Sequence, residues 1–262
     1  MHSMQQQWPD CPYPIALICN GTVPGPDEAA GLHTSTQAEE DVAGHFALPM
    51  NPRFINVGTD AGWGANLVRA LEQLDTDYVI YLQEDYFLDH PVSTHSMQQH
   101  LGYCETHQVD YLRLGWPWYD DEQTAPYCTD DFRHRYALCL QPAIWRASVL
   151  KRLSGMVYDG WEFERTIKQR IRSEGLRVQA RVLHSSRYPH QGIQQVDGTA
   201  IRKGLWTRGG ERFLIDNGFG HLIAKRGVEG SVANWLMHRE HPLTKLPAVL
   251  LLRLMKRLKI NF

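Results

Sequence analysis

The chain has 262 residues, of which 43% are hydrophobic and 21% charged, a balance typical of a globular protein with a large core. Its formal net charge of −2 lacks the basic excess of nucleic-acid-binding proteins, so we expect no nucleic acid partner. Five cysteines without a CxxC pair argue against a disulfide framework or a thiolate zinc site and favour a reducing compartment.

The N-terminal part predicts two short strands separated by a long loop. Residues 1–7 are polar and indicate a disordered lead, with no apolar leader peptide. Short apolar runs predict strands at Ile15–Cys19 and Phe54–Val57, and residues 22–50 have the composition of a loop. No apolar run is long enough for a membrane-spanning helix, so we expect a cytoplasmic protein.

A glycine-rich turn over residues 58–64 leads into a helix predicted over residues 65–74. Such a turn can present backbone N–H groups and a helix N-terminus to a phosphate, although a plain tight turn has the same composition. The next predicted strand would complete a β-turn-α-β unit, which places both features at one sheet edge.

The stretch Tyr78–Leu88 is an apolar and aromatic run that contains two adjacent acids, Glu84 and Asp85. The run predicts a strand buried on both faces, as in the middle of a parallel sheet. Neighbouring carboxylates at the end of such a strand raise each other's pKa, which favours a divalent cation as their partner. The alternative is a strand that leaves the sheet in a solvated acidic turn.

The remaining sequence alternates predicted helices and strands. Helices are predicted over residues 92–107, 146–153 and 159–173, the last stopped at Gly175, and strands over residues 109–114, 136–140 and 177–183. An aromatic loop follows the first of these strands, and its Trp116, Trp118 and Tyr119 suit either sugar stacking or packing.

Two later segments have a distinctive composition. Residues 184–210 are polar and rich in glycine, as in an active-site flap or a solvated loop. Residues 243–262 combine many leucines with lysine and arginine and contain no acid. They predict a basic amphipathic helix, either on an anionic membrane surface or docked on the core.

Together these features resemble the GT-A-type glycosyltransferases, most closely bacterial proteins of surface-polysaccharide loci that carry a motif like Leu82–Leu88, LQEDYFL. The resemblance runs from about Trp8 to Trp206. It implies an α/β fold, a Rossmann-like open mixed sheet flanked by helices. It also implies transfer of a sugar from a nucleotide-sugar donor to a hydroxyl of a glycan or lipid-linked acceptor.

The resemblance also assigns donor and metal residues. The metal-binding DxD of the family falls on Gln83–Asp85, so Asp85 and Glu84 would hold Mn²⁺ or Mg²⁺, although Gln83 replaces the first Asp. His184 or His190 could supply a third ligand or a diphosphate contact; either could equally be an ordinary surface or core histidine. Donor contacts are expected from Trp63, Gly64, Asn66 and Arg69, and Arg202 and Lys203 could clamp the diphosphate or belong to a solvated loop.

The catalytic acid of the family lies eleven residues before a glycine, which here is Glu164 before Gly175, with Glu162 as a competitor. In an inverting transfer this carboxylate would take the proton of the acceptor hydroxyl. A retaining transfer needs no such base. The plain alternative is that both acids only stabilise a helix N-terminus.

We therefore predict one domain over residues 1–242 and a separate helix over residues 243–262. The chain begins at what resembles the second strand of the family, so we expect the first βα unit to be missing. One alternative function is an inactive relative that binds nucleotide or glycan, and another is a metal-dependent phosphoesterase that uses Glu84 and Asp85.

Overall fold

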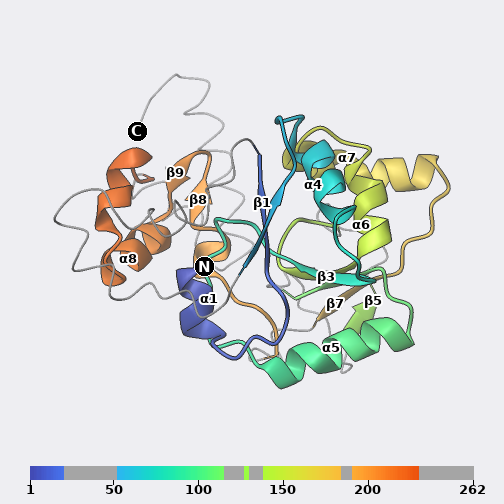
Figure 1. The fold of residues 1–262 in the computed structure, drawn as a ribbon, viewed down its shortest axis with the longest axis horizontal. Coiled ribbons are helices and arrows are strands. Elements are labelled where there is room, and N and C mark those ends of the chain that lie inside the picture. The colour runs from blue at the N-terminus through green and yellow to red at the C-terminus, as the bar shows by residue number, and fades with distance from the viewer. Residues whose placement is uncertain (21–51, 115–126, 130–137, 184–190, 230–262) are drawn as a thin grey trace, which may run out of the picture. The chain divides into compact units, whose positions relative to one another are not determined.

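The computed structural model describes residues 1–20, 52–114, 127–129, 138–183 and 191–229, and the fold is drawn in Figure 1. The chain forms two compact units. The first comprises residues 1–83 and 90–194, and the second comprises residues 84–89 and 195–262. Each unit is considered by itself.

A five-stranded mixed sheet is the centre of the first unit. Its strands are β3 (Tyr78–Tyr81), β4 (Tyr111–Arg113), β5 (Tyr127–Thr129), β6 (Ala143–Arg146) and β7 (Ala180–Leu183), in the order β3-β6-β4-β7-β5. β6 is antiparallel to both of its neighbours, and β4 is parallel to β7. β3, β4 and β7 therefore end at the same edge, and the prediction of an α/β fold with a mixed sheet is confirmed at this level.

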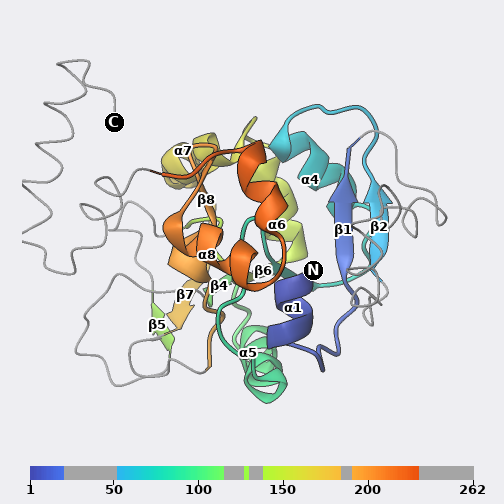
Figure 2. The same ribbon diagram turned by 90° about the vertical axis from the view of Figure 1, so that its left-hand side faces the viewer.

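Helices cover both faces of this sheet. α4 (Trp63–Leu71), α6 (Ala147–Ser154) and α7 (Gly160–Ser173) lie on one face, and α5 (Thr94–Thr106) lies on the other (Figures 1 and 2). The main core forms between the three helices and the sheet, and its buried side chains include Leu67, Leu71, Tyr111, Trp145, Leu150, Leu153, Phe163, Ile167 and Ile171.

Two further strands make a separate parallel pair, β1 (Ala16–Cys19) and β2 (Arg53–Asn56). Ile55 and Val57 are buried against Ala70 of α4, so this pair packs on the same helix as the larger sheet. The strands predicted over 15–19, 54–57, 109–114 and 177–183 and the helices predicted over 65–74, 92–107, 146–153 and 159–173 are confirmed apart from their end residues. Gly175 has a φ of 63°, which explains why α7 stops before it.

The position of β3 differs from the prediction. Among the described strands it pairs only with β6, in antiparallel fashion, and all four of its residues are partly buried. The strand was expected to be central and parallel. Its tyrosines explain the difference, because an aromatic ring can pack while its hydroxyl reaches a polar group. The Tyr78 hydroxyl donates to the Cys104 carbonyl at 3.0 Å.

The N-terminal segment is also ordered, contrary to the prediction. Residues His2–Gln7 form the helix α1, and the Gln7 carbonyl accepts a hydrogen bond from the Val92 amide at 2.7 Å. Trp8 follows with 1% of its surface exposed and donates to the Thr94 hydroxyl at 2.7 Å. A six-residue helix is too short to show a clear apolar period, and the buried tryptophan anchors it.

Two strands were not predicted where they occur. A strand was expected over residues 136–140, but residues 138–140 are not a strand, and residues 136–137 lie outside the described part. The strand in this region is β6, which begins at Ala143. β6 continues directly into α6. β5 was missed as well, because it is only three residues long.

The second unit is built around a hairpin and a helix. β8 (Ile201–Arg202) and β9 (Leu205–Trp206) pair in antiparallel fashion, and α8 (Arg208–Asp216) and the 3-10 helix η2 (Gly220–Lys225) follow. The Phe87 ring packs against Trp206 and Phe213. Residues 201–206 therefore form a hairpin and residues 208–210 the start of a helix, so the solvated loop considered for them is wrong here, and a role as an active-site flap stays a prediction.

No helix in the described part of the chain is long and apolar enough to cross a bilayer. The predicted basic helix over residues 243–262 lies outside the described residues, as do residues 22–50 and the aromatic loop with Trp116, Trp118 and Tyr119. Binding to an anionic membrane surface stays a prediction.

The contact between α4 and the turn after α6 predicts a sharp cost for one added methyl group. A Cβ at Gly64 would lie 2.1 Å from the Val157 carbonyl oxygen and 2.4 Å from that of Ser154. Because backbone must move, Gly64→Ala should lower the free energy of unfolding by about 1–3 kcal/mol in chemical denaturation. Gly102→Ala is the control, since no atom lies within 4 Å of its Cβ position on α5. It should stabilise by up to about 1 kcal/mol, and equal effects of the two changes would contradict the packing described.

Candidate functional site

The C-terminal edge of β3 and β4 gathers several of the predicted residues of the first unit. Ala143, the first residue of β6, pairs with both Tyr81 and Arg113, so the residues just before it lie beyond this edge. One of them is Leu140, whose amide donates to Glu164 Oε1 at 3.0 Å. The first turn of α7 therefore lies at the edge of the sheet where β3 and β4 end.

Glu164 has the properties of a carboxylate prepared for proton transfer. It is half-buried, and burial raises its pKa above the usual carboxyl value, while the hydrogen bond from Leu140 acts in the opposite direction. A raised pKa makes the ionised carboxylate a stronger base at neutral pH. The arrangement suits abstraction of a proton from a hydroxyl.

Glu162 has a different set of contacts, which cap the helix. Its Oε2 accepts from the Tyr158 amide at 2.7 Å, and its own amide donates to Asp159 Oδ1 at 2.6 Å, as in a capping box. Its Oε1 forms an ion pair with Arg170 at 2.5 Å. Both carboxylate oxygens of Glu162 thus have structural partners, and its role as catalytic base remains an untested prediction.

Trp63 connects the start of α4 to the end of β3 and to α7. Its indole nitrogen donates to the Tyr81 hydroxyl at 3.2 Å, and the Gln83 amide donates to the same hydroxyl at 3.4 Å. The Trp63 ring meets Phe163 edge to face, with centroids 5.6 Å apart. The predicted donor residue Trp63 therefore lies at the same sheet edge as Glu164.

Asn66 and Arg69, also predicted to contact the donor, hold the turn before α4 in shape. Asn66 accepts from the Ala61 amide at 3.2 Å and donates to Asp60 Oδ1 at 2.7 Å. Arg69 donates to the carbonyls of Val57 and Thr59, at 3.1 and 2.9 Å. Together with the close packing of Gly64 described above, these contacts stabilise the loop that lines a pocket.

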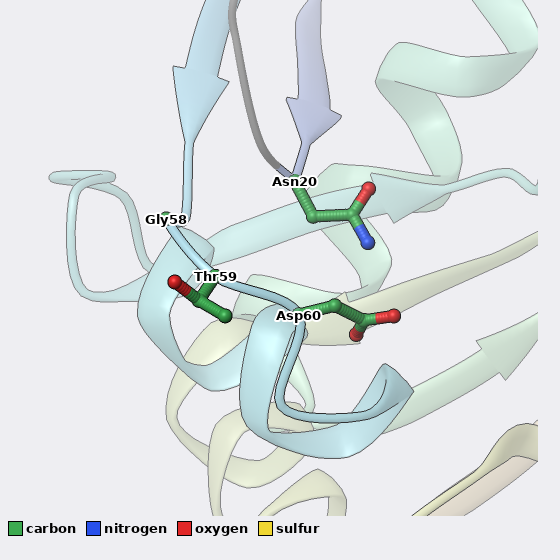
Figure 3. A pocket seen from close by; sticks show the side chains of 4 residues that line it. All are labelled: Asn20, Gly58, Thr59 and Asp60. Carbon is green, nitrogen blue, oxygen red and sulfur yellow. The ribbon is translucent and has the colours of Figure 1, made fainter.

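This pocket has a volume of about 530 Å³ and is lined by Asn20, Gly58, Thr59 and Asp60 (Figure 3). It lies where the parallel strands β1 and β2 end, the usual place for a ligand in an open α/β sheet. The Gly62 amide and the Asn66 side chain lower the pKa of Asp60, so its carboxylate is ionised at neutral pH. A fixed negative charge beside an amide suits the edge of a base or the hydroxyls of a ribose better than a phosphate.

The sequence did not single out these four residues as a site. In the sequence Asn20 is the residue after a predicted strand, and residues 58–60 belong to the predicted glycine-rich turn. The signal that points to them is the pairing of β1 with β2, which brings two strand ends together. That pairing joins residues separated by a long segment, so local patterns do not contain it.

The predicted metal residues Asp85 and Glu84 belong to the second unit. Asp85 Oδ2 accepts from the Thr199 hydroxyl at 2.6 Å, burial raises the Asp85 pKa, and nearby Glu84 raises it further. Glu84 itself is exposed. No cluster of three or more His, Cys, Asp or Glu side chains suited to a metal occurs among the described residues, and His184 and His190 lie outside them.

Two carboxylates nevertheless fit a cation of the Mg²⁺ type. Such ions are commonly held by one or two carboxylates, with water and substrate phosphates completing the shell. The raised pKa of Asp85 is consistent with this, because a cation would compensate the cost of a buried negative charge. The donor atoms are therefore suitable in kind.

Arg202 and Lys203, predicted to clamp a diphosphate, lie at the hairpin of the second unit. Arg202 forms an ion pair with Glu229 at 3.2 Å, and both side chains are largely buried. Lys203 is exposed at the turn, where its φ is 53° and that of Gly204 is 81°, as in a type I′ turn. Arg202 thus has a structural partner, and Lys203 is open to solvent.

Comparison with known proteins gives limited similarity. No protein-family model matches the chain, and no curated protein matches it. Two solved structures of S. aureus TarS are similar, one of them spanning residues 1–349, each with 18% identity and a TM-score of 0.33 over 58% of this chain. The matches cover 46% and 28% of those chains, so this chain spans less than half of either. Likeness at this level does not establish a shared fold, and the function has to come from the residues of this chain.

The environment of Glu164 predicts that neutralising it will stabilise the protein in a pH-dependent way. Because the pKa of Glu164 is raised in the folded state, its ionisation lowers the free energy of unfolding. This loss of stability is absent below the ordinary glutamate pKa of about 4.3 and is complete once the pH has risen through the raised pKa. Glu164→Gln keeps an oxygen for the Leu140 amide and removes the charge. Its free energy of unfolding should equal that of the wild type near pH 4 and exceed it at pH 7.5. A variant less stable than the wild type at pH 7.5 would show that the charge is compensated.

Proposed function

We propose that this protein is a glycosyltransferase that moves a sugar from a nucleoside diphosphate donor to a hydroxyl of a glycan or lipid-linked acceptor. The observation that supports this most directly is Glu164, a half-buried carboxylate with a raised pKa at the end of β3 and β4. It lies in the same unit as a polar pocket of about 530 Å³ at the ends of β1 and β2.

The nucleoside of the donor is proposed to bind in the pocket of Asn20, Gly58, Thr59 and Asp60. The pocket has a hydrogen-bond acceptor in Asp60 and an amide in Asn20, which match the polar edge of a base or a ribose diol. Trp63 begins α4 three residues after Asp60, and its indole reaches the Tyr81 hydroxyl at the end of β3. A donor in the pocket would therefore point its sugar along the first turn of α4.

The reaction requires a proton acceptor if the anomeric configuration is inverted. The acceptor oxygen forms the bond to the anomeric carbon, its proton passes to Glu164, and the bond from that carbon to the diphosphate breaks. The nucleoside diphosphate leaves with the bonding electrons. We assign this proton transfer to Glu164 rather than Glu162, because both oxygens of Glu162 serve the cap and the Arg170 ion pair.

For the second unit by itself, Asp85, with Glu84, is proposed to hold Mn²⁺ or Mg²⁺. The cation would supply stabilisation of the negative charge that develops on the departing diphosphate. Thr199 orients Asp85 by donating to its Oδ2 at 2.6 Å.

Nucleotide binding gives the first test of this function. At a ligand concentration of 100 Kd, a nucleoside diphosphate with Mn²⁺ should raise Tm by about 5–10 °C. Asn20→Asp should abolish most of this shift, because it places a second negative charge beside Asp60. If no nucleoside diphosphate raises Tm in the wild type, the transferase assignment is wrong.

Hydrolysis of the nucleotide-sugar donor, or transfer where an acceptor is found, tests the assigned base. Glu164→Gln should lower kcat for transfer by about 10²–10⁴-fold and leave the nucleotide-induced Tm shift unchanged. Glu162→Gln is the matched control, since it keeps an oxygen for the Tyr158 amide. Its kcat for transfer should stay within a few-fold of the wild-type value. Nucleotide binding without any turnover would identify an inactive relative, and equal losses in both variants would refute the assignment to Glu164.

A further inference from the structure

Two aromatic side chains at the start of α7 are unusually exposed. Tyr158 has 68% and Trp161 has 67% of its surface accessible, whereas Trp145 and Phe163 in the adjoining core are fully buried. Two large exposed rings three positions apart in the chain are uncommon on a protein surface without a binding role. The proposed chemistry leaves both of these rings unexplained.

Trp161 is a neighbour of the proposed base on the helix surface. It precedes Glu164 by three residues within α7, and side chains at this spacing lie on the same side of a helix with Cβ atoms about 5–6 Å apart. A ring stacked on Trp161 would therefore present its edge toward Glu164.

Tyr158 is held in place although most of its ring is exposed. Its amide donates to Glu162 at 2.7 Å, and its carbonyl accepts from the Gly64 amide at 3.2 Å. The ring lies over the N-terminal turn of α4, since a Cβ at Gly62 would be 2.6 Å from Tyr158 Cε2. A ring anchored in this way loses little conformational freedom when it binds a ligand.

We propose that Tyr158 and Trp161 form a platform on which a pyranose ring of the acceptor glycan stacks, with a hydroxyl directed toward Glu164. The proposal rests on the proposed function and names the acceptor surface of the same site. A pyranose has an apolar C–H face that matches an aromatic ring and a rim of hydroxyls that match carboxylates and amides.

The surroundings favour a glycan over a lipid surface or an apolar protein partner. Asp159, Glu162 and Glu164 add carboxylates near the two rings in the chain, and Arg165 and Arg170 add guanidinium groups, so acceptors and donors for sugar hydroxyls lie on the same helix start. Tyr158 also lines a shallow groove of about 540 Å³ together with Ala61, Ala65, Arg69 and Met156. Its lining is mostly apolar and includes one guanidinium group, which gives room and an apolar surface for the C–H face of a second sugar residue.

Binding of sugars to the full chain tests the platform without any need for turnover. The probes are methyl glycosides of glucose, galactose and N-acetylglucosamine and their β-linked disaccharides, measured by saturation-transfer NMR and tryptophan fluorescence. At least one probe should bind the wild type, and Trp161→Ala and Tyr158→Ala should each weaken it by roughly three- to tenfold. Trp161→Phe should restore most of the affinity, because it keeps a flat ring.

The control variant is Ile215→Ala, which removes an exposed apolar side chain of α8 and should leave sugar binding unchanged. Where transfer of sugar to one of the probes is measurable, Trp161→Ala should raise the KM for that acceptor. It should leave the KM for the nucleotide-sugar donor unaltered. If the wild type binds sugar but no nucleotide, and Trp161→Ala loses the sugar, the platform is supported and the transferase assignment is refuted. Normal nucleotide binding with no sugar bound, or with sugar binding indifferent to both rings, would overturn the platform. Trp161-dependent binding to anionic vesicles in place of sugars would overturn it as well.

Discussion

The hydrogen bond from the Leu140 amide to Glu164 is the contact on which the candidate site depends. Leu140 lies just before β6, and β6 pairs through Ala143 with the ends of both β3 and β4. One backbone donor thus sets the position of a carboxylate relative to a sheet edge formed by three strands. It also partly compensates the burial of that carboxylate, which otherwise would favour the protonated acid and raise the pKa further.

Two acids on one helical turn have been given different environments. Glu162 donates its amide to the cap residue Asp159, accepts from the Tyr158 amide and pairs with Arg170, so its charge stabilises the start of α7. Glu164 lies toward the core side, next to Phe163, and its charge is an energetic cost in the folded protein. Groups that are unfavourable for stability and are nevertheless held in place are often those that perform chemistry. The physical difference between the two acids therefore supports the assignment of proton transfer to Glu164.

The loop before α4 shows how a binding pocket can be shaped by residues that do not line it. Asn66 and Arg69 use their side chains to hold Asp60 and the backbone of residues 57–59. The pocket itself consists of the strand-end residues Asn20, Gly58, Thr59 and Asp60. Substitution of Asn66 or Arg69 is thus expected to act on a ligand through the shape of the loop.

Local patterns in the sequence determined the helices from α4 to α7, the two short N-terminal strands and the acid-rich start of α7. Apolar periodicity, the Asp159 cap and Gly175 act within a few residues, and such signals can be read without a fold. Tertiary structure decided which strands are neighbours: it placed β3 beside β6, inserted β6 in antiparallel fashion, and paired β1 with β2 to form the pocket. It also decided that Glu164 meets Leu140, whereas Glu162 meets Arg170. These contacts join residues far apart in the chain or depend on which face of a helix meets the core, and both are properties of packing that no short stretch of sequence contains.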